Sequence, residues 1–209
     1  MTQMQGIPSH SRKQSFSLAL QPQQAWMAIL GLLLVTALCL AAGLGKVLNI
    51  IFPAGSFAVG LFLYLRYPIL YVGFTWWVFF LTPFIRRVSD NRSGFTDPSP
   101  MLLAPPLVAM ITIITFYRNL PKAHEQGSLP FVISAMGVFY GFLVGLINGL
   151  PVPAIVSLMA WVSPILFGFH LFVNWRDYPS YRQNIQRTFL WCVLITASYG
   201  VYQYLVAPE

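Results

Sequence analysis

The sequence predicts an all-α membrane protein, a polytopic bundle of about seven transmembrane helices. Hydrophobic residues make up 57% of the 209 positions, and charged residues make up only 8%. A soluble globular domain has about 25% charged residues, so this chain lacks the charge to cover a water-facing surface. Its apolar residues also fall in blocks of roughly 17–22, the length at which a helix crosses a hydrocarbon core.

A polar tail rich in Gln and Ser comes before the first apolar block. We expect residues 1–24 to be a disordered cytoplasmic tail and residues 25–209 to form one transmembrane domain. The first block is longer than the apolar core of a secretory signal peptide, about 7–15 residues, so we expect a retained helix. The seven blocks predict helices at about residues 25–44, 47–65, 68–84, 101–117, 129–150, 152–173 and 188–206.

Glycine and proline mark the ends of the first three helices. Gly43 and Gly45 predict a tight turn after the first helix, and Pro53 falls in the early turns of the second, where proline is tolerated. The third helix has Trp76 and Trp77 near one end, as in an interfacial aromatic belt. The second and third helices are joined so closely that a re-entrant hairpin is an alternative, which would change the helix count by one.

The later helices are separated by a polar loop and by prolines. We expect residues 85–100 to be the most polar loop of the chain. Pro151 and Pro153 end the fifth helix and begin the sixth, and Pro164 predicts a kink in the sixth.

Lysines and arginines in the loops predict the orientation. With the N-terminus in the cytoplasm, eight of the twelve lie inside and four lie outside, which favours a cytoplasmic N-terminus. The inside residues are Arg12, Lys13, Arg66, Arg118, Lys122, Arg176, Arg182 and Arg187, and the outside residues are Lys46, Arg86, Arg87 and Arg92. Three of the four outside residues crowd into one loop, and that exception needs its own explanation.

The composition also bears on partners and cofactors. The net charge of +7 is scattered between apolar blocks, which favours contact with membrane lipid head groups over a nucleic-acid partner. Neither C-x-x-C nor H-E-x-x-H is present, and Cys39 and Cys192 lie inside apolar blocks, so we expect no metal site and no cofactor.

The pair Arg86-Arg87, followed by Asp90, is the sharpest chemical feature of the sequence. Arginine presents a planar fork of donors that suits phosphate. Two arginines at an outer helix end can hold a lipid-linked pyrophosphate, with Asp90 orienting one of them. The alternative is that they are ordinary interfacial arginines in contact with lipid phosphates.

Two further features lie inside the helices. Gly137, Gly141, Gly145 and Gly149 recur every fourth residue, a pattern that predicts close helix packing at the centre of the bundle or at a dimer contact. His170 is an ionisable residue within a span, a functional candidate by default, although its position near the helix end favours a neutral interfacial histidine.

Several stretches carry a family resemblance. They are residues 81–88 (LTPFIRRV) with Asp90, 103–108 (LAPPLV), Leu129-Pro130 with Tyr140-Gly141, and 200–204 (GVYQY) with Pro208. In order and spacing they resemble the N-terminal half of the bacterial O-antigen ligase and polymerase superfamily, particularly exopolysaccharide polymerase-like members.

The resemblance implies a glycosyltransferase-C-like enzyme of the bacterial inner membrane. Such proteins move a glycan from an undecaprenyl pyrophosphate carrier to an acceptor on the outer face, usually without a metal. Members of the family continue into a second half that holds their catalytic residues, and no position here matches those residues. We therefore expect a truncated chain, one piece of a split protein or a remnant without activity.

Three functions remain open from the sequence. The first is a glycan polymerase or ligase-like protein that handles a lipid-linked oligosaccharide, which the motif order and the outward basic loop favour. The second is a non-catalytic scaffold that partners a separately encoded second half or forms a homo-oligomer, which the glycine pattern fits. The third is a transporter or permease subunit, although the spans lack buried acids and a clear inverted repeat of broken helices.

Overall fold

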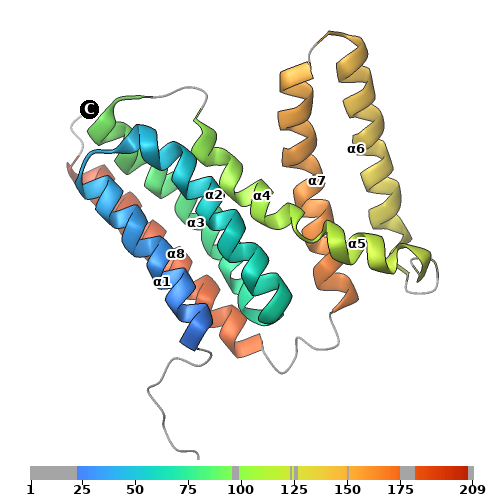
Figure 1. Ribbon diagram of the computed structural model, residues 1–209, viewed down its shortest axis with the longest axis horizontal. Helices are drawn as coiled ribbons and strands as arrows, with labels where there is room; N and C mark the ends of the chain where they lie inside the picture. The colour runs from blue at the N-terminus through green and yellow to red at the C-terminus, as the bar shows by residue number, and fades with distance from the viewer. Residues whose placement is uncertain are drawn as a thin grey trace, which may run out of the picture.

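The computed structural model is an all-α bundle, and every regular element among its described residues is a helix (Figure 1). It describes residues 23–95, 99–122, 124, 127–149, 151–174 and 182–206. The α-helices are α1 (Gln23–Ala41), α2 (Gly45–Arg66), α3 (Pro68–Ser93), α4 (Ala104–Met110), α5 (Ile113–Asn119), α6 (Leu129–Ile147), α7 (Pro151–Val173) and α8 (Arg182–Val206). Two 3₁₀ helices, η1 (Pro100–Leu103) and η2 (Leu120–Lys122), flank α4 and α5.

Within the described part of the chain, six helical segments are long and apolar enough to cross a membrane. They are α1, α2, α3, the stretch Pro100–Lys122, α6 and α7. A shorter apolar run, Phe189–Tyr202, lies within α8. The prediction of a polytopic all-α membrane protein is therefore confirmed.

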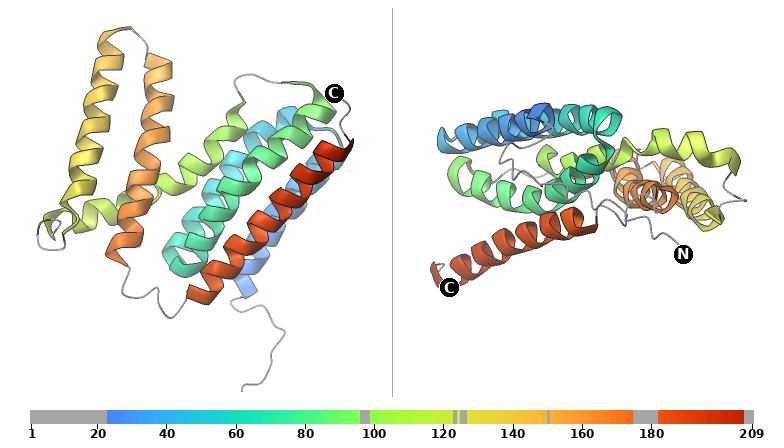
Figure 2. Two further views of the ribbon diagram at one scale, coloured as in Figure 1. Left: turned by 180° about the vertical axis from the view of Figure 1, so that it is seen from behind. Right: turned by 90° about the horizontal axis from the view of Figure 1, so that it is seen from below.

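The helices form a four-helix group with a hairpin beside it. Helices α1, α2, α3 and α8 run side by side, while α6 and α7 form an antiparallel pair to one side (Figures 1 and 2). Helix α4 packs between α2 and α7 and so joins the two parts. The α1–α2 turn and the α6–α7 turn lie at one end of the molecule, and α1 begins at the other end.

The buried core is centred on α2, α3 and α4. Its largest fully buried side chains include Tyr71, Leu48, Leu63, Met101 and Val108. Helix α6, by contrast, has no buried residue. Its sequence is apolar all along, so its exposed faces suit contact with lipid or with another protein.

The sequence prediction ended the third helix at residue 84, which is wrong by nine residues. Helix α3 continues to Ser93, so Arg86, Arg87 and Asp90 lie on a helix rather than in a loop. Ile85 and Ser89 are buried and continue the four-residue spacing of the apolar face. Polar residues on the exposed face concealed this continuation.

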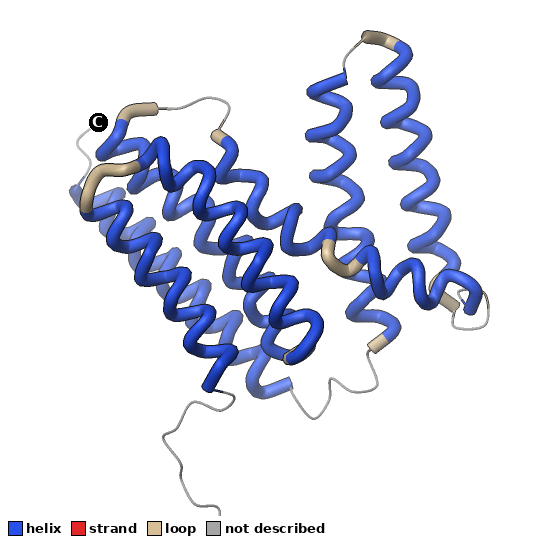
Figure 3. The backbone as a smooth tube through the Cα atoms, viewed as in Figure 1, coloured by secondary structure: helices blue, strands red, loops and turns tan. Residues whose placement is uncertain are grey.

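The predicted fourth helix, residues 101–117, is interrupted. It begins as η1, continues as α4 and breaks at Ile111–Thr112 before α5 (Figure 3). Pro105 and Pro106 lie in the first turn of α4, where proline is well accommodated. They therefore do not explain a break five residues later.

The remaining helix ends differ by a few residues. Helix α6 ends at Ile147 rather than residue 150, because Gly149 adopts a left-handed φ of 73° in the turn to α7. Helix α8 begins at Arg182, six residues before the predicted start at 188. Most of the predicted tail, residues 1–22, and the loop residues 175–181 lie outside the described residues.

Candidate functional site

The end of α3 is fastened to the turn between α1 and α2. The Ser93 hydroxyl donates to the Gly43 carbonyl at 3.0 Å and accepts the Gly45 amide at 3.1 Å. Gly43 needs its left-handed φ of 68°, and a Cβ on Gly45 would lie 2.5 Å from Ser93 Oγ. Both glycines are therefore required for this turn to fit against α3.

Arg92 strengthens the same junction. Its Nη1 donates to the carbonyls of Leu40 and Ala41, at 3.2 and 3.4 Å, in the last turn of α1. These carbonyls belong to the group that a helix end leaves without internal partners. One of the four predicted outside cations therefore caps α1.

Arg86 is held on two sides. Its Nε lies 3.4 Å from Asp90 Oδ2, one helical turn further along α3. Its guanidinium carbon lies 5.6 Å from the centre of the Phe95 ring. The structure thus brings Arg86 and Asp90 together, and an aromatic residue that the sequence analysis did not single out completes the arrangement.

Arg87 is exposed at the same end of α3. Consecutive residues of an α-helix point about 100° apart, so Arg86 and Arg87 leave α3 in different directions. Lys46 is exposed in the first turn of α2, whose start Ser93 contacts. We call Lys46, Arg86, Arg87, Asp90 and Arg92 the basic end.

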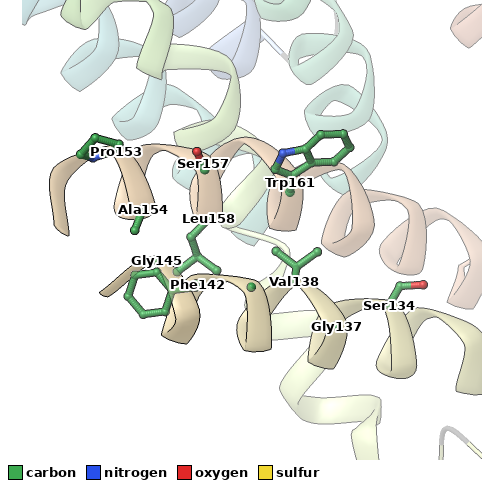
Figure 4. A pocket seen from close by; sticks show the side chains of 11 residues that line it. Ser134, Gly137, Val138, Phe142, Gly145, Pro153, Ala154, Ser157, Leu158 and Trp161 are labelled. Carbon is green, nitrogen blue, oxygen red and sulfur yellow. The ribbon is translucent and has the colours of Figure 1, made fainter. Parts of the chain in front are cut away.

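The glycine pattern lines an open groove between α6 and α7. The groove has a volume of about 570 Å³, and Figure 4 shows Ala154 and Leu158 of α7 pointing toward the part of α6 that holds Phe142 and Gly145. The two helices approach closely near the turn, where a Cβ on Gly145 would lie 3.0 Å from Ala154 Cβ.

The groove is wider away from the turn. A Cβ on Gly137 or Gly141 would meet no heavy atom within 4 Å. Gly149 lies in the turn rather than on the helix. Within the described part of the chain, close packing at the predicted glycines is therefore restricted to Gly145.

The break in the fourth span is a polar site that the sequence analysis missed. The Thr112 amide donates to Ala109 O at 3.1 Å instead of to Val108 O, four residues back. The Tyr71 hydroxyl of α3 donates to Val108 O at 2.7 Å in place of the Thr112 amide, and the Ile111 amide donates to the same oxygen at 3.3 Å. A side chain inserted into the helical ladder is a recognised cause of such a kink.

Next to the break, His170 of α7 belongs to a buried polar cluster. Its Nδ1 lies 2.7 Å from Thr115 Oγ1 of α5, which in turn lies 2.7 Å from the Tyr64 hydroxyl of α2. Asn174 Nδ2 is a more distant neighbour, at 3.4 Å from Nδ1. We call Tyr64, Thr115, His170 and Asn174 the polar cluster.

His170 is far more enclosed than an interfacial histidine. It is 4% exposed, and the rings of Tyr64 and Tyr71 lie 5.7 and 5.9 Å from its centre. Its Nε2 is buried and has no hydrogen-bond partner among the described residues. The one sequence feature that pointed to this cluster was the pair Thr115 and Asn119, which are four residues apart in one span. The pair alone does not predict a site, because the cluster depends on a contact with α7 that the sequence does not reveal.

Metal-ligating side chains do not gather at any of these places. Among the described residues there is no group of three or more His, Cys, Asp or Glu side chains. Comparison of the chain with protein-family models, with curated proteins and with solved structures found no match.

Proposed function

We propose that this chain is a multi-pass protein of the bacterial inner membrane that binds an undecaprenyl pyrophosphate-linked glycan at its basic end. The proposal joins the resemblance to O-antigen polymerases and ligases with the chemistry of that end of the molecule. A polymerase or ligase-like protein must hold its lipid-linked substrate by the part that all substrates share, which is the diphosphate.

The observation that carries the proposal is the setting of Arg86 between Asp90 and Phe95. Asp90 lies against Nε, on one edge of the guanidinium. Arginine has five N–H donors, so the outer Nη edge has donors left for a phosphate. Because Asp90 and Phe95 already hold the Arg86 side chain, it loses less conformational entropy when a ligand binds.

The charge of the basic end supports an anionic ligand. Lys46, Arg86, Arg87 and Arg92 outnumber Asp90 among its described residues. If the N-terminus is cytoplasmic, as the loop charges predict, this end faces outward, where a positive cluster goes against the usual distribution. A bound diphosphate would neutralise these cations and would account for a positive cluster at that surface.

A binding assay with the full chain in lipid nanodiscs tests the proposal. Undecaprenyl diphosphate should bind, and Arg86→Gln together with Arg87→Gln should weaken it by about 10-fold or more, since a charge-assisted hydrogen bond contributes about 1.5–3 kcal/mol. Arg118→Gln is the matched control, because Arg118 is an exposed arginine on α5, away from the basic end. Unchanged affinity in the double variant would exclude the basic end as the diphosphate site.

A transporter or permease subunit is the second candidate, and the break between α4 and α5 favours it. Interrupted helices beside buried polar groups often form the binding sites of transporters. A solute-dependent proton flux into proteoliposomes, measured over a panel of sugars and anions and lost in His170→Gln, would support this candidate. A chain that binds the diphosphate lipid without any such flux would favour the first.

A scaffold or partner subunit is the third candidate, and the exposure of α6 favours it. Helix α6 packs on α7 and has no buried residue. A second half of the protein or another copy of the chain would cover such a face. Purification of the chain as a monomer that still binds the diphosphate lipid would argue against this candidate.

A further inference from the structure

The five buried threonines of the described residues divide into two kinds. Thr36, Thr75, Thr82 and Thr112 donate to a carbonyl of their own segment three or four residues earlier. This is the usual bond of a threonine inside a membrane helix. Thr115 instead turns its hydroxyl toward Tyr64 and His170.

The two hydrogen bonds of the Thr115 hydroxyl join three separate helices. Thr115 belongs to α5, Tyr64 to α2 and His170 to α7. Helix α5 has only seven residues and follows directly after the break at Ile111–Thr112. Thr115 is its one buried residue. The polar cluster therefore provides the buried polar attachment of α5, beside an apolar contact between the rings of Phe116 and Phe169 of α7, whose centroids lie 4.9 Å apart.

The bonds of the cluster suit a neutral imidazole. Tyr64 O–H can donate to Thr115 Oγ1, and Thr115 O–H can donate to His170 Nδ1, which leaves the ring proton on Nε2. Each hydroxyl then donates one bond. A protonated ring has N–H groups at both nitrogens, so Nδ1 could only donate to Thr115, and the order of donors along Tyr64, Thr115 and His170 would have to reverse.

Among the residues that the structure describes, no carboxylate lies near the ring to balance a positive charge. Tyr64 of α2 and Tyr71 of α3 face the imidazole, with Thr115 of α5 and Asn174 beyond α7. Arg66 of α2 and Arg118 of α5 are exposed, and the charged residues of α3 lie at the basic end. Helices α4 and α7 contain no Asp, Glu, Lys or Arg. A buried imidazolium in this setting is strongly unfavourable.

We propose that His170 is a proton-operated latch that fixes α5 against α2 and α7. The neutral ring accepts the Thr115 hydroxyl and holds α5 in place. Uptake of a proton favours an arrangement in which α5 has swung away at the break and His170 reaches water. Because the open arrangement binds the proton better, acid shifts the population toward it, and the closed arrangement dominates at higher pH.

Two spin labels on the full chain in nanodiscs measure the opening. The sites are Leu65 on α2 and Tyr117 on α5, which are 70% and 79% exposed, each changed to Cys in a chain carrying Cys39→Ser and Cys192→Ser. An exposed imidazole titrates near pH 6.5, so distances are compared at about pH 8 and about pH 5. The expected result is one distance population at the higher pH and a second, longer population at the lower pH.

Variants assign the change to the latch. His170→Gln keeps an acceptor for Thr115 and cannot be protonated, so it should show the closed population at both pH values. Thr115→Val removes the bond and should show the open population at both. His124→Gln, at an exposed histidine outside the cluster, should respond as the wild-type chain does. The proposal is overturned if the wild-type distances do not depend on pH, or if His170→Gln responds to acid like the wild type.

Discussion

The Tyr71 hydroxyl donates to the Val108 carbonyl at 2.7 Å, at the point where the fourth span breaks. Both residues are fully buried. The bond links α3 to the last turn of α4 and gives the Val108 carbonyl a second donor beside the Ile111 amide, which lies at 3.3 Å. It is the clearest single cause of the break among the described residues.

Tyr71→Phe tests this cause. Loss of the hydroxyl leaves the buried Val108 carbonyl with only the 3.3 Å bond from the Ile111 amide, so the free energy of unfolding should fall by about 0.5–1.5 kcal/mol. The melting temperature in detergent checks the prediction. Tyr117→Phe is the control, because Tyr117 is 79% exposed and should change little. Equal melting temperatures for Tyr71→Phe and the wild-type chain would show that this bond does not stabilise the fold.

Gly45→Ala tests the junction between α3 and the α1–α2 turn. The new Cβ would lie 2.5 Å from Ser93 Oγ and 2.7 Å from Ser89 Oγ. Overpacking of this kind costs about 1–3 kcal/mol. Gly31→Ala in α1 meets nothing within 4 Å and should be neutral or slightly stabilising. The two melting temperatures should therefore shift in opposite directions or by clearly different amounts, and similar shifts would contradict the tight junction.

A pair of leucine substitutions tests the α6–α7 groove. Gly145→Leu should separate the hairpin, because Ala154 already lies 3.0 Å from the position of the new Cβ. Gly141→Leu should be tolerated, since its Cβ position is open. The fraction of each variant that elutes as folded protein on size exclusion gives the comparison. A severe loss for Gly141→Leu would mean that another chain packs into the groove.

Asp90→Asn tests whether Asp90 orients Arg86 for ligand binding or stabilises the fold. The Arg86–Asp90 pair is one turn apart on α3 and partly exposed, so it contributes only about 0.3–0.5 kcal/mol to folding. The melting temperature should therefore change little. Binding of the diphosphate lipid should weaken, because Arg86 loses the carboxylate that orients it. A large fall in melting temperature with unchanged binding would show that the pair stabilises the fold and does not position Arg86 for the ligand.

The sequence predicts the apolar segments well because their length is set by the bilayer. All seven predicted blocks coincide with helices, with the fourth divided in two. Helix ends are less well predicted, because charged residues occur both in loops and on the exposed faces of helices. Residues 85–93 are helical despite Arg86, Arg87 and Asp90, because the buried side of the helix continues through Ile85 and Ser89.

In the candidate sites, contacts within one helix could be predicted from the sequence and contacts between distant segments could not. The Arg86–Asp90 contact was predictable, since residues four apart on a helix are neighbours. The Phe95 contact depends on the chain direction after Ser93 and was not. The polar cluster could not be predicted either, because Tyr64 and His170 are separated by 106 positions and meet only through the packing of α2, α5 and α7. Tertiary contacts of this kind leave no local pattern in the sequence.

The most direct measurement for the basic end is the ratio of two affinities in the full chain. Undecaprenyl diphosphate and phosphatidylglycerol both present phosphate, and only the diphosphate matches the proposed ligand. The wild-type chain should prefer undecaprenyl diphosphate by about 10-fold or more, and Arg86→Gln should remove most of that preference. Equal affinity for the two lipids in the wild-type chain would show that these arginines contact ordinary membrane phosphates, and it would contradict the account.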